Sequence, residues 1–214
     1  MKKIIFSATI CLLMAINVFS QDWSYDVYSV GRKYPGYIIK TDGTKTEGYI
    51  KAQARAGLEG VGSSNQNSVE FYTDPENKKT KVVYKPEDLK EYKIAEKVYR
   101  SMNYSGGLTS KPVRFLLLVQ DGAIARYSWY DHEGYEPGNT IPPTPHYVEK
   151  VIYQKGSEKP FEESSFLLGF SKKMSALVSD YPELATKVTN EEKGYKLLSI
   201  REIIAEYNAW YSKK

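Results

Sequence analysis

Two histidines, His132 and His146, are the residues best suited to chemistry in this sequence, and Asp131, Glu133 and Glu136 lie beside the first of them. Neutral imidazole and carboxylate oxygen together form a legitimate ligand set for zinc or another divalent metal. The thirteen residues that separate the histidines match no common metal-binding spacing, however, and the segment between them is rich in proline and glycine. A flexible loop does not hold ligands in place. We therefore predict two surface histidines near loop carboxylates, with no metal and no other cofactor.

Serine chemistry has equally little support. The serines in glycine-rich settings are Ser63, Ser64 and Ser105, and none lies in the strand–Gly-x-Ser-x-Gly–helix turn of an α/β-hydrolase. The glycines in 57–62 do not form a phosphate-binding loop, because no strand leads directly into them and no Lys-Ser/Thr pair follows. No single pair of carboxylates stands out for glycoside cleavage among the 26 acidic residues. We predict no catalytic residue.

The first twenty residues have the layout of a secretory signal peptide. Lys2 and Lys3 precede an uncharged run over 4–19, and the small residue Ser20 suits the position before cleavage. The run is shorter than the ~20 apolar residues that a membrane-spanning helix needs. A retained anchor, or a lipid on Cys11, is the less favoured alternative. We predict an exported protein, located in the periplasm, in the cell envelope or outside the cell, with no membrane span after cleavage.

Cleavage after Ser20 would remove Cys11, the single cysteine, so the mature chain would hold no thiol for a disulfide, a thiolate nucleophile or a zinc–thiolate site. Removing Lys2 and Lys3 lowers the basic residues from 30 to 28, against 26 acidic, so the net charge falls from +4 to about +2. Charges of both signs are interspersed, and no basic stripe is visible. These features argue against nucleic-acid binding.

Residues 113–130 are the segment around which the fold is expected to form. Two runs of apolar and aromatic residues flank Asp121-Gly122, the strongest short-range signal for a β-hairpin. A two-residue turn would pair Leu118 with Ala125 and Leu116 with Tyr127. The first run is apolar on both of its faces, so we expect a central strand that is covered on both sides.

The remaining strands are expected before and after this hairpin, and helices only at the end. Residues 37–51, 68–85 and 91–102 read as further antiparallel strands, and 146–154 as a returning strand. Beyond residue 159 the apolar period changes from two to 3.6, with a stripe from Phe166 to Tyr181 that Ser164 or Ser165 could cap. A short helix follows Pro182, and a last one carries a stripe from Leu197 to Tyr211.

This order predicts one α+β domain over 21–214, mainly β over 21–159 and helical over 160–214. We expect an antiparallel, twisted sheet or partial β-barrel of about eight strands, followed by about three C-terminal helices. The helices should cover the central hairpin.

A binding site is predicted at one end of this sheet. In a simple up-and-down meander, the loops 103–112 and 131–145 would share one end with the turn 74–79, and the mobile loop 52–67 would lie at the other. Long loops at the end of a rigid sheet concentrate binding residues. The candidate ligand-binding residues on this rim are Tyr104, Tyr130, Asp131, His132, Tyr135 and His146. The 19 tyrosines suit sugar or protein surfaces, although tyrosine is also a common strand residue.

Several short patterns accompany these features: Gly36-Tyr37-Ile38-Ile39, Glu47-Gly48-Tyr49-Ile50, Ser179-Asp180-Tyr181-Pro182 and Tyr207-Asn208-Ala209-Trp210. Together with the leader, they resemble uncharacterised secreted or envelope proteins of Bacteroidota-type bacteria over most of the mature chain. The resemblance implies an extracytoplasmic location and brings no activity. We expect a non-enzymatic binding or structural module whose partner is an envelope protein or glycan. The alternative is a secreted hydrolase of glycans or peptides, with or without a metal, which requires a deep pocket joining a histidine to carboxylates.

Overall fold

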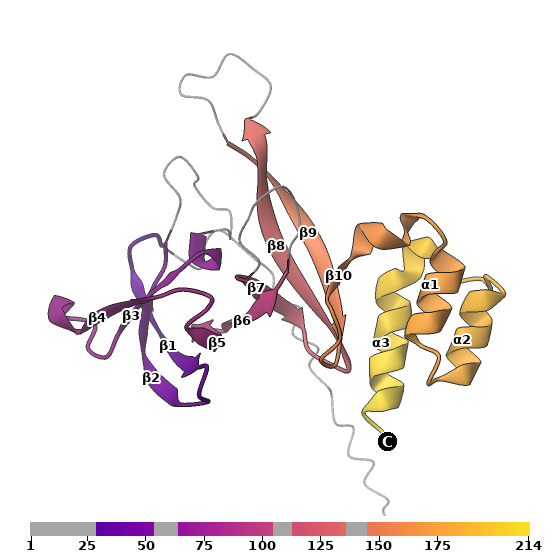
Figure 1. Cartoon of the computed structure of the whole chain (residues 1–214), viewed down its shortest axis with the longest axis horizontal. Helices are drawn as coiled ribbons and strands as arrows, with labels where there is room; N and C mark the ends of the chain where they lie inside the picture. The colour runs from indigo at the N-terminus through magenta and orange to yellow at the C-terminus, as the bar shows by residue number, and fades with distance from the viewer. Residues whose placement is uncertain (1–28, 54–63, 105–112, 136–144) are drawn as a thin grey trace, which may run out of the picture.

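The computed structural model describes residues 29–53, 64–104, 113–135 and 145–214, with the side chains of 131–135 and 145–147 left out. In these ranges a ten-stranded antiparallel sheet is followed by three α-helices, so the predicted α+β class is confirmed (Figure 1). The predicted signal segment lies outside the described residues. The strands are β1 (Lys33–Lys40), β2 (Lys45–Lys51), β3 (Val69–Tyr72), β4 (Lys81–Tyr84), β5 (Leu89–Ile94), β6 (Lys97–Asn103), β7 (Val113–Gln120), β8 (Ile124–Tyr135), β9 (Pro145–Lys155) and β10 (Phe161–Glu162).

The sheet is two meanders joined through β1. The strand order is β10-β9-β8-β7-β6-β5-β1-β2-β3-β4, so β5 pairs with β1 although it follows β4 in the chain. A flat sheet would separate β4 from β5 by roughly 19 Å, four strand spacings of about 4.8 Å. Only 85–88 connect them, in a turn where the Asp88 N–H donates to the Lys85 carbonyl. The first four strands must therefore curl toward β5, and the sheet is an open, partial barrel.

The prediction for the central strand is confirmed. Leu116, Leu117 and Leu118 of β7 are all buried. Leu117 points into the core of the curled half, where it joins residues of β1, β2, β3, β5 and β6. Leu116 and Leu118 point to the opposite face and pack with Tyr127, Trp129 and other residues of β6, β8 and β9.

The helices do not cover β7, contrary to our expectation. They are α1 (Phe170–Leu177), α2 (Pro182–Thr189) and α3 (Ile200–Tyr211), and they pack on Ile124 and Tyr153 at the far end of the sheet (Figure 1). The curled half of the sheet already covers one face of β7. The helices therefore pack on the apolar face of β8, β9 and β10.

Two local predictions for the helices are also wrong. Phe166 lies in a 3₁₀-helix, η3 (Glu163–Leu167), and α1 begins later, with Gly169 as its N-cap in place of a serine. Gly169 has a φ of +72°, a left-handed conformation that turns the chain between the two helices. Phe166 still packs in the same cluster as Met174 and Val178, so the apolar stripe was correct although the helix is not continuous.

The register of the β7–β8 hairpin differs from the two-residue turn expected at Asp121-Gly122. Leu118 pairs with Tyr127, two residues beyond its expected partner, and a bulge shifts the register before Gln120. A shift of two keeps Leu117, Leu118 and their partners Ser128 and Tyr127 on the predicted faces. The cause lies in α3: the Asn208 carboxamide accepts from the Ile124 N–H (2.8 Å) and donates to the Ile124 carbonyl (2.9 Å). The Asn208 carboxamide thus takes the place of the β7 backbone as the hydrogen-bond partner of Ile124.

A second carboxamide separates β7 from β8 at the other end of the hairpin. Gln66, in the 3₁₀-helix η1 (Ser64–Gln66), accepts from the Tyr130 N–H (2.8 Å) and donates to the Tyr130 carbonyl (3.0 Å). The adjacent Asn65 binds the end of β2 through the Gln53 N–H (3.1 Å) and the Lys51 carbonyl (3.2 Å). The described ends of the predicted mobile loop 52–67 are thus fixed.

These contacts also overturn the simple meander that underlay our placement of the loops. Gln66 reaches Tyr130 on the predicted rim, although 52–67 was expected at the opposite end of the sheet. The β5–β1 pairing breaks the up-and-down order. Successive loops therefore do not lie at alternating ends of the sheet, as we had assumed.

Candidate functional site

Most of the predicted rim residues lie on strands of the β8–β9 hairpin. Asp131, His132 and Tyr135 belong to β8 and His146 to β9, so the connection is shorter than the expected loop 131–145. In the register, His132 is opposite Tyr147 and Tyr135 is opposite Pro145, which brings the two histidines to neighbouring positions of paired strands. Their side chains, and the loops 105–112 and 136–144, lie outside the described residues.

Tyr104 is not on an open rim. Its ring is buried and contacts Trp129 edge-on, with 5.7 Å between ring centroids, and its hydroxyl donates to a carboxylate oxygen of Glu162. This contact joins the end of β6 to β10. Tyr130 is half-buried, and its backbone is held by Gln66. Of the six candidates, the two with described side-chain surroundings thus have structural partners.

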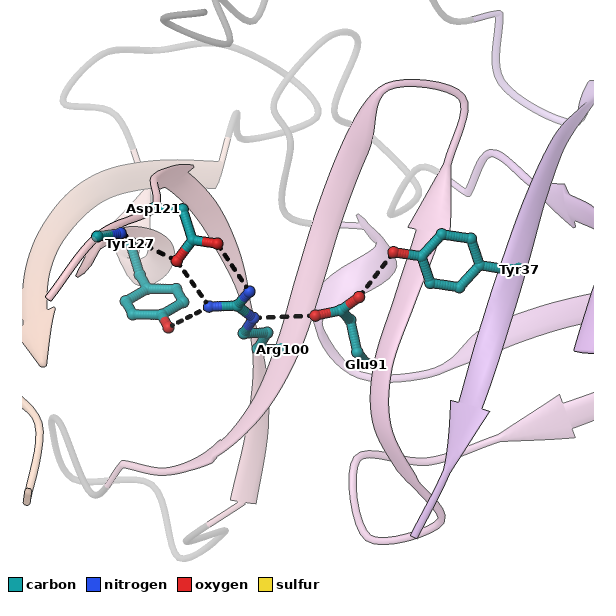
Figure 2. A network of polar contacts seen from close by, with 6 residues as sticks. Tyr37, Glu91, Arg100, Asp121 and Tyr127 are labelled. Carbon is teal, nitrogen blue, oxygen red and sulfur yellow. Dashed lines mark hydrogen bonds and ion pairs between the residues drawn. The ribbon is translucent and has the colours of Figure 1, made fainter. Parts of the chain in front are cut away.

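A polar network that the sequence did not reveal crosses the sheet at Arg100 (Figure 2). The guanidinium donates from Nε to Glu91 (2.9 Å) and forms a two-pronged pair with Asp121, each bond 3.1 Å long. It also donates to the Tyr127 hydroxyl (3.3 Å), and Tyr37 donates to the second oxygen of Glu91 (2.7 Å). The network ties β1, β5 and β6 to both sides of the β7–β8 turn.

The electrostatics of this network indicate stabilisation, not catalysis. Burial alone would raise the pKa of Asp121, but the hydrogen bonds and charge of Arg100 outweigh it and hold that pKa below its usual value. Burial and then the hydrogen bond to Glu91 raise the pKa of Tyr37. The carboxyl group of Asp121 therefore stays ionised and the phenol of Tyr37 neutral at pH 7, so neither of these two groups is poised to transfer a proton. A cleft of about 590 Å³ borders Arg100 and Tyr127.

Replacing Arg100 with glutamine tests this reading. The variant leaves Glu91 and Asp121 without their cation, and we expect a loss of about 1–2 kcal/mol of unfolding free energy at pH 7, discounted because the Asp121 side chain is 63% exposed. A lowered aspartate pKa stabilises the fold above the unfolded value near 3.9 and ceases to do so as pH falls through the folded value. The difference between the two proteins, measured by urea denaturation, should therefore shrink below about pH 4. Lys79→Gln, which removes an exposed lysine from the turn between β3 and β4, outside this network, should change little at any pH.

A hollow lies between β9 and the C-terminal helices. We call it the β9–α3 groove; its volume is about 840 Å³ and it is lined by 148–151, 162–164, Leu167, 197–198 and 200–202. Strand β9 forms one wall, η3 another, and the start of α3 a third.

The rim of the groove carries exposed leucines. Leu198 is 97% exposed and Leu167 67% exposed, and Leu168, beside Leu167, is also exposed. Single exposed apolar residues are ordinary, but several large ones around one concavity are typical of an interaction surface. The signal in the sequence was two leucine doublets, at 167–168 and 197–198.

Two carboxylates of the groove are held by hydrogen bonds from hydroxyl groups of the protein. Glu163 accepts a hydrogen bond from the Tyr153 hydroxyl (2.6 Å), and Glu149 accepts one from the Ser128 hydroxyl. Burial, and then the bond to Glu163, raise the pKa of Tyr153. The lining contains no histidine or cysteine among its described residues. Across the described residues as a whole, His, Cys, Asp and Glu form no group of three that could hold a metal ion.

No family model matches the sequence, and the comparisons with curated proteins and with solved structures find no similar chain. Within the described ranges, no helix combines the length and the apolar character needed to cross a membrane.

Proposed function

We propose that this chain is an exported, non-enzymatic binding module that holds a partner protein in the β9–α3 groove. The observation that carries the proposal is the groove itself, about 840 Å³ in volume, with Leu198 and Leu167 exposed at its rim. A surface that leaves such side chains in water gains free energy when a partner covers them, at roughly 25 cal/mol per Å² of apolar area.

Binding without chemistry agrees with the polar groups of the groove. Glu149 and Glu163 already accept hydrogen bonds from neighbouring hydroxyls, which places and orients their carboxylates. The alternative, a hydrolase built on His132 or His146, depends on two side chains that lie outside the described residues. Export is supported by the leader, with Lys2 and Lys3 before an uncharged run.

Site-specific photo-crosslinking in intact cells tests the proposal. A photoreactive amino acid at position 198 should give a discrete adduct with one envelope or secreted protein, because that side chain lies at the mouth of the groove. The same substitution at Val82, which is 45% exposed on β4, is the matched control. Adducts at both positions with the same yield, or at neither, would contradict a groove-specific function. Leu198→Glu should abolish the interaction yet leave the melting temperature within about 2 °C, because the residue is outside the core.

A further inference from the structure

The outer edge of β9 is longer than the strand that covers it. β9 has eleven residues, whereas β10 pairs only with Ile152 and Tyr153. Within the described residues, no strand pairs with the outer edge of β9 before Ile152, and this stretch forms one wall of the β9–α3 groove.

The direction of the peptide groups along this edge follows from contacts on the other side of the hairpin. The N–H and C=O of Tyr130 both bond to Gln66, so they point away from β9. Tyr130 pairs with Glu149, which makes these two a non-hydrogen-bonded pair of the antiparallel ladder. The N–H and C=O of Glu149 must then point outward, and alternation gives Val151 the same direction. Tyr153, two residues on, is where β10 attaches.

The two outer edges of the sheet differ. β4, at the other end of the sheet, is four residues long, begins with Lys81 and is flanked by Lys79 and Lys85, a common device against unwanted strand pairing. The outer edge of β9 instead faces a groove whose rim is apolar. The Glu162–Ile152 pair is a non-hydrogen-bonded pair of the β9–β10 ladder, so the carbonyl of Val151 faces the N–H of Glu163. Within the described ranges, no strand pairs with Glu149 on this edge.

We propose that an extended segment of the partner adds to β9 as a strand, in line with β10, and that this segment alternates aliphatic with basic residues. The inference rests on the proposed function and specifies its mode. Backbone hydrogen bonds to the outward N–H and C=O of Glu149 would supply register, and side chains between β9 and α3 would supply selectivity.

The charges of the groove select a basic segment. Its lining contains four carboxylates, Glu149, Glu162, Glu163 and Glu202, against two cations, Lys150 and Arg201. The full chain is positively charged, at +4, so a cationic peptide would be repelled by the protein as a whole and attracted only locally. Aliphatic side chains of the segment would cover Leu198, Leu167 and Val151.

The inference is tested by measuring the binding of labelled synthetic peptides by fluorescence anisotropy. The protein is purified from the cells that produce it naturally. The probe is a labelled ten-residue peptide of alternating valine and lysine. In a second peptide every valine is N-methylated, and in a third every lysine is N-methylated. Each of these two peptides lacks the backbone N–H donors along one edge of the extended strand. One methylated peptide should bind at least about tenfold more weakly than the parent and the other within about threefold, because only one set faces β9. A valine–glutamate peptide should not bind.

The outcomes separate this inference from the proposed function. If both methylated peptides bind as the parent does, and Leu198→Glu still weakens all three, the groove binds peptides but not by strand addition, and the inference is overturned. If the parent peptide fails to bind although position 198 crosslinks to a partner in cells, the partner chemistry is wrong and the proposed function stands. Failure of both experiments overturns both. Val83→Glu on β4 is the matched protein control and should leave peptide binding unchanged.

Discussion

Gly36→Ala is expected to lower the free energy of unfolding by about 4 kcal/mol or more, enough to leave much of the protein unfolded. An added Cβ would lie 1.8 Å from the carbonyl oxygen of Lys93 on β5. The obstacle is backbone, not a flexible side chain, so β1 and β5 would have to separate. Because β5 joins the two meanders only through β1, the strain falls on the one ladder that unites the sheet.

Urea denaturation followed by far-UV circular dichroism measures this effect. Gly43→Ala is the matched control: its Cβ would meet nothing within 4 Å, and only the positive φ of +91° opposes it. That conformation costs an L-residue about 1–2 kcal/mol. Equal midpoints for the two variants would mean that β1 and β5 do not approach as closely as described, and the joined sheet would be wrong.

Local sequence signals were sufficient to predict most strands and helices, but not the register and packing between them. The apolar run at Leu116, Leu117 and Leu118 correctly predicted a strand buried on both faces, because successive residues of a strand point to opposite faces and all three are apolar. The register of its hairpin depends on Asn208, 84 residues from Ile124, which no short-range pattern encodes. Gln66, 64 residues from Tyr130, acts in the same way. Both are polar residues that replace missing backbone partners.

The candidate site shows the same limit. The β9–α3 groove is assembled from β9, η3 and the start of α3, which meet only in the folded protein, so the sequence offered only the leucine doublets at 167–168 and 197–198. Tyr104 was chosen as a rim residue because it lies in the predicted loop 103–112, yet its ring is buried against Trp129. The edge-on contact with Trp129 and the hydrogen bond to Glu162 stabilise the Tyr104 side chain in this buried position.

Leu116→Ala and Leu117→Ala are each expected to cost about 3–5 kcal/mol, the range typical of a leucine truncated in a tightly packed core. Both side chains are buried, but they belong to separate clusters on opposite faces of β7. Although adjacent in the chain, the two residues share no side-chain cluster. Their effects should therefore add to within about 0.5 kcal/mol in the double variant.

The test is a double-mutant cycle by urea denaturation, with Val119→Ala as a control because Val119 is only partly buried at the edge of the same core. The double variant approaches the total stability of an ordinary domain, so it should be measured with a stabilising osmolyte present in all samples. A coupling energy above about 1 kcal/mol would show that the two faces of β7 form one core. Additivity, in contrast, would mean that β7 separates two independent cores, and that the curled half of the sheet and the hairpin carrying the groove are stabilised on opposite sides of a single strand.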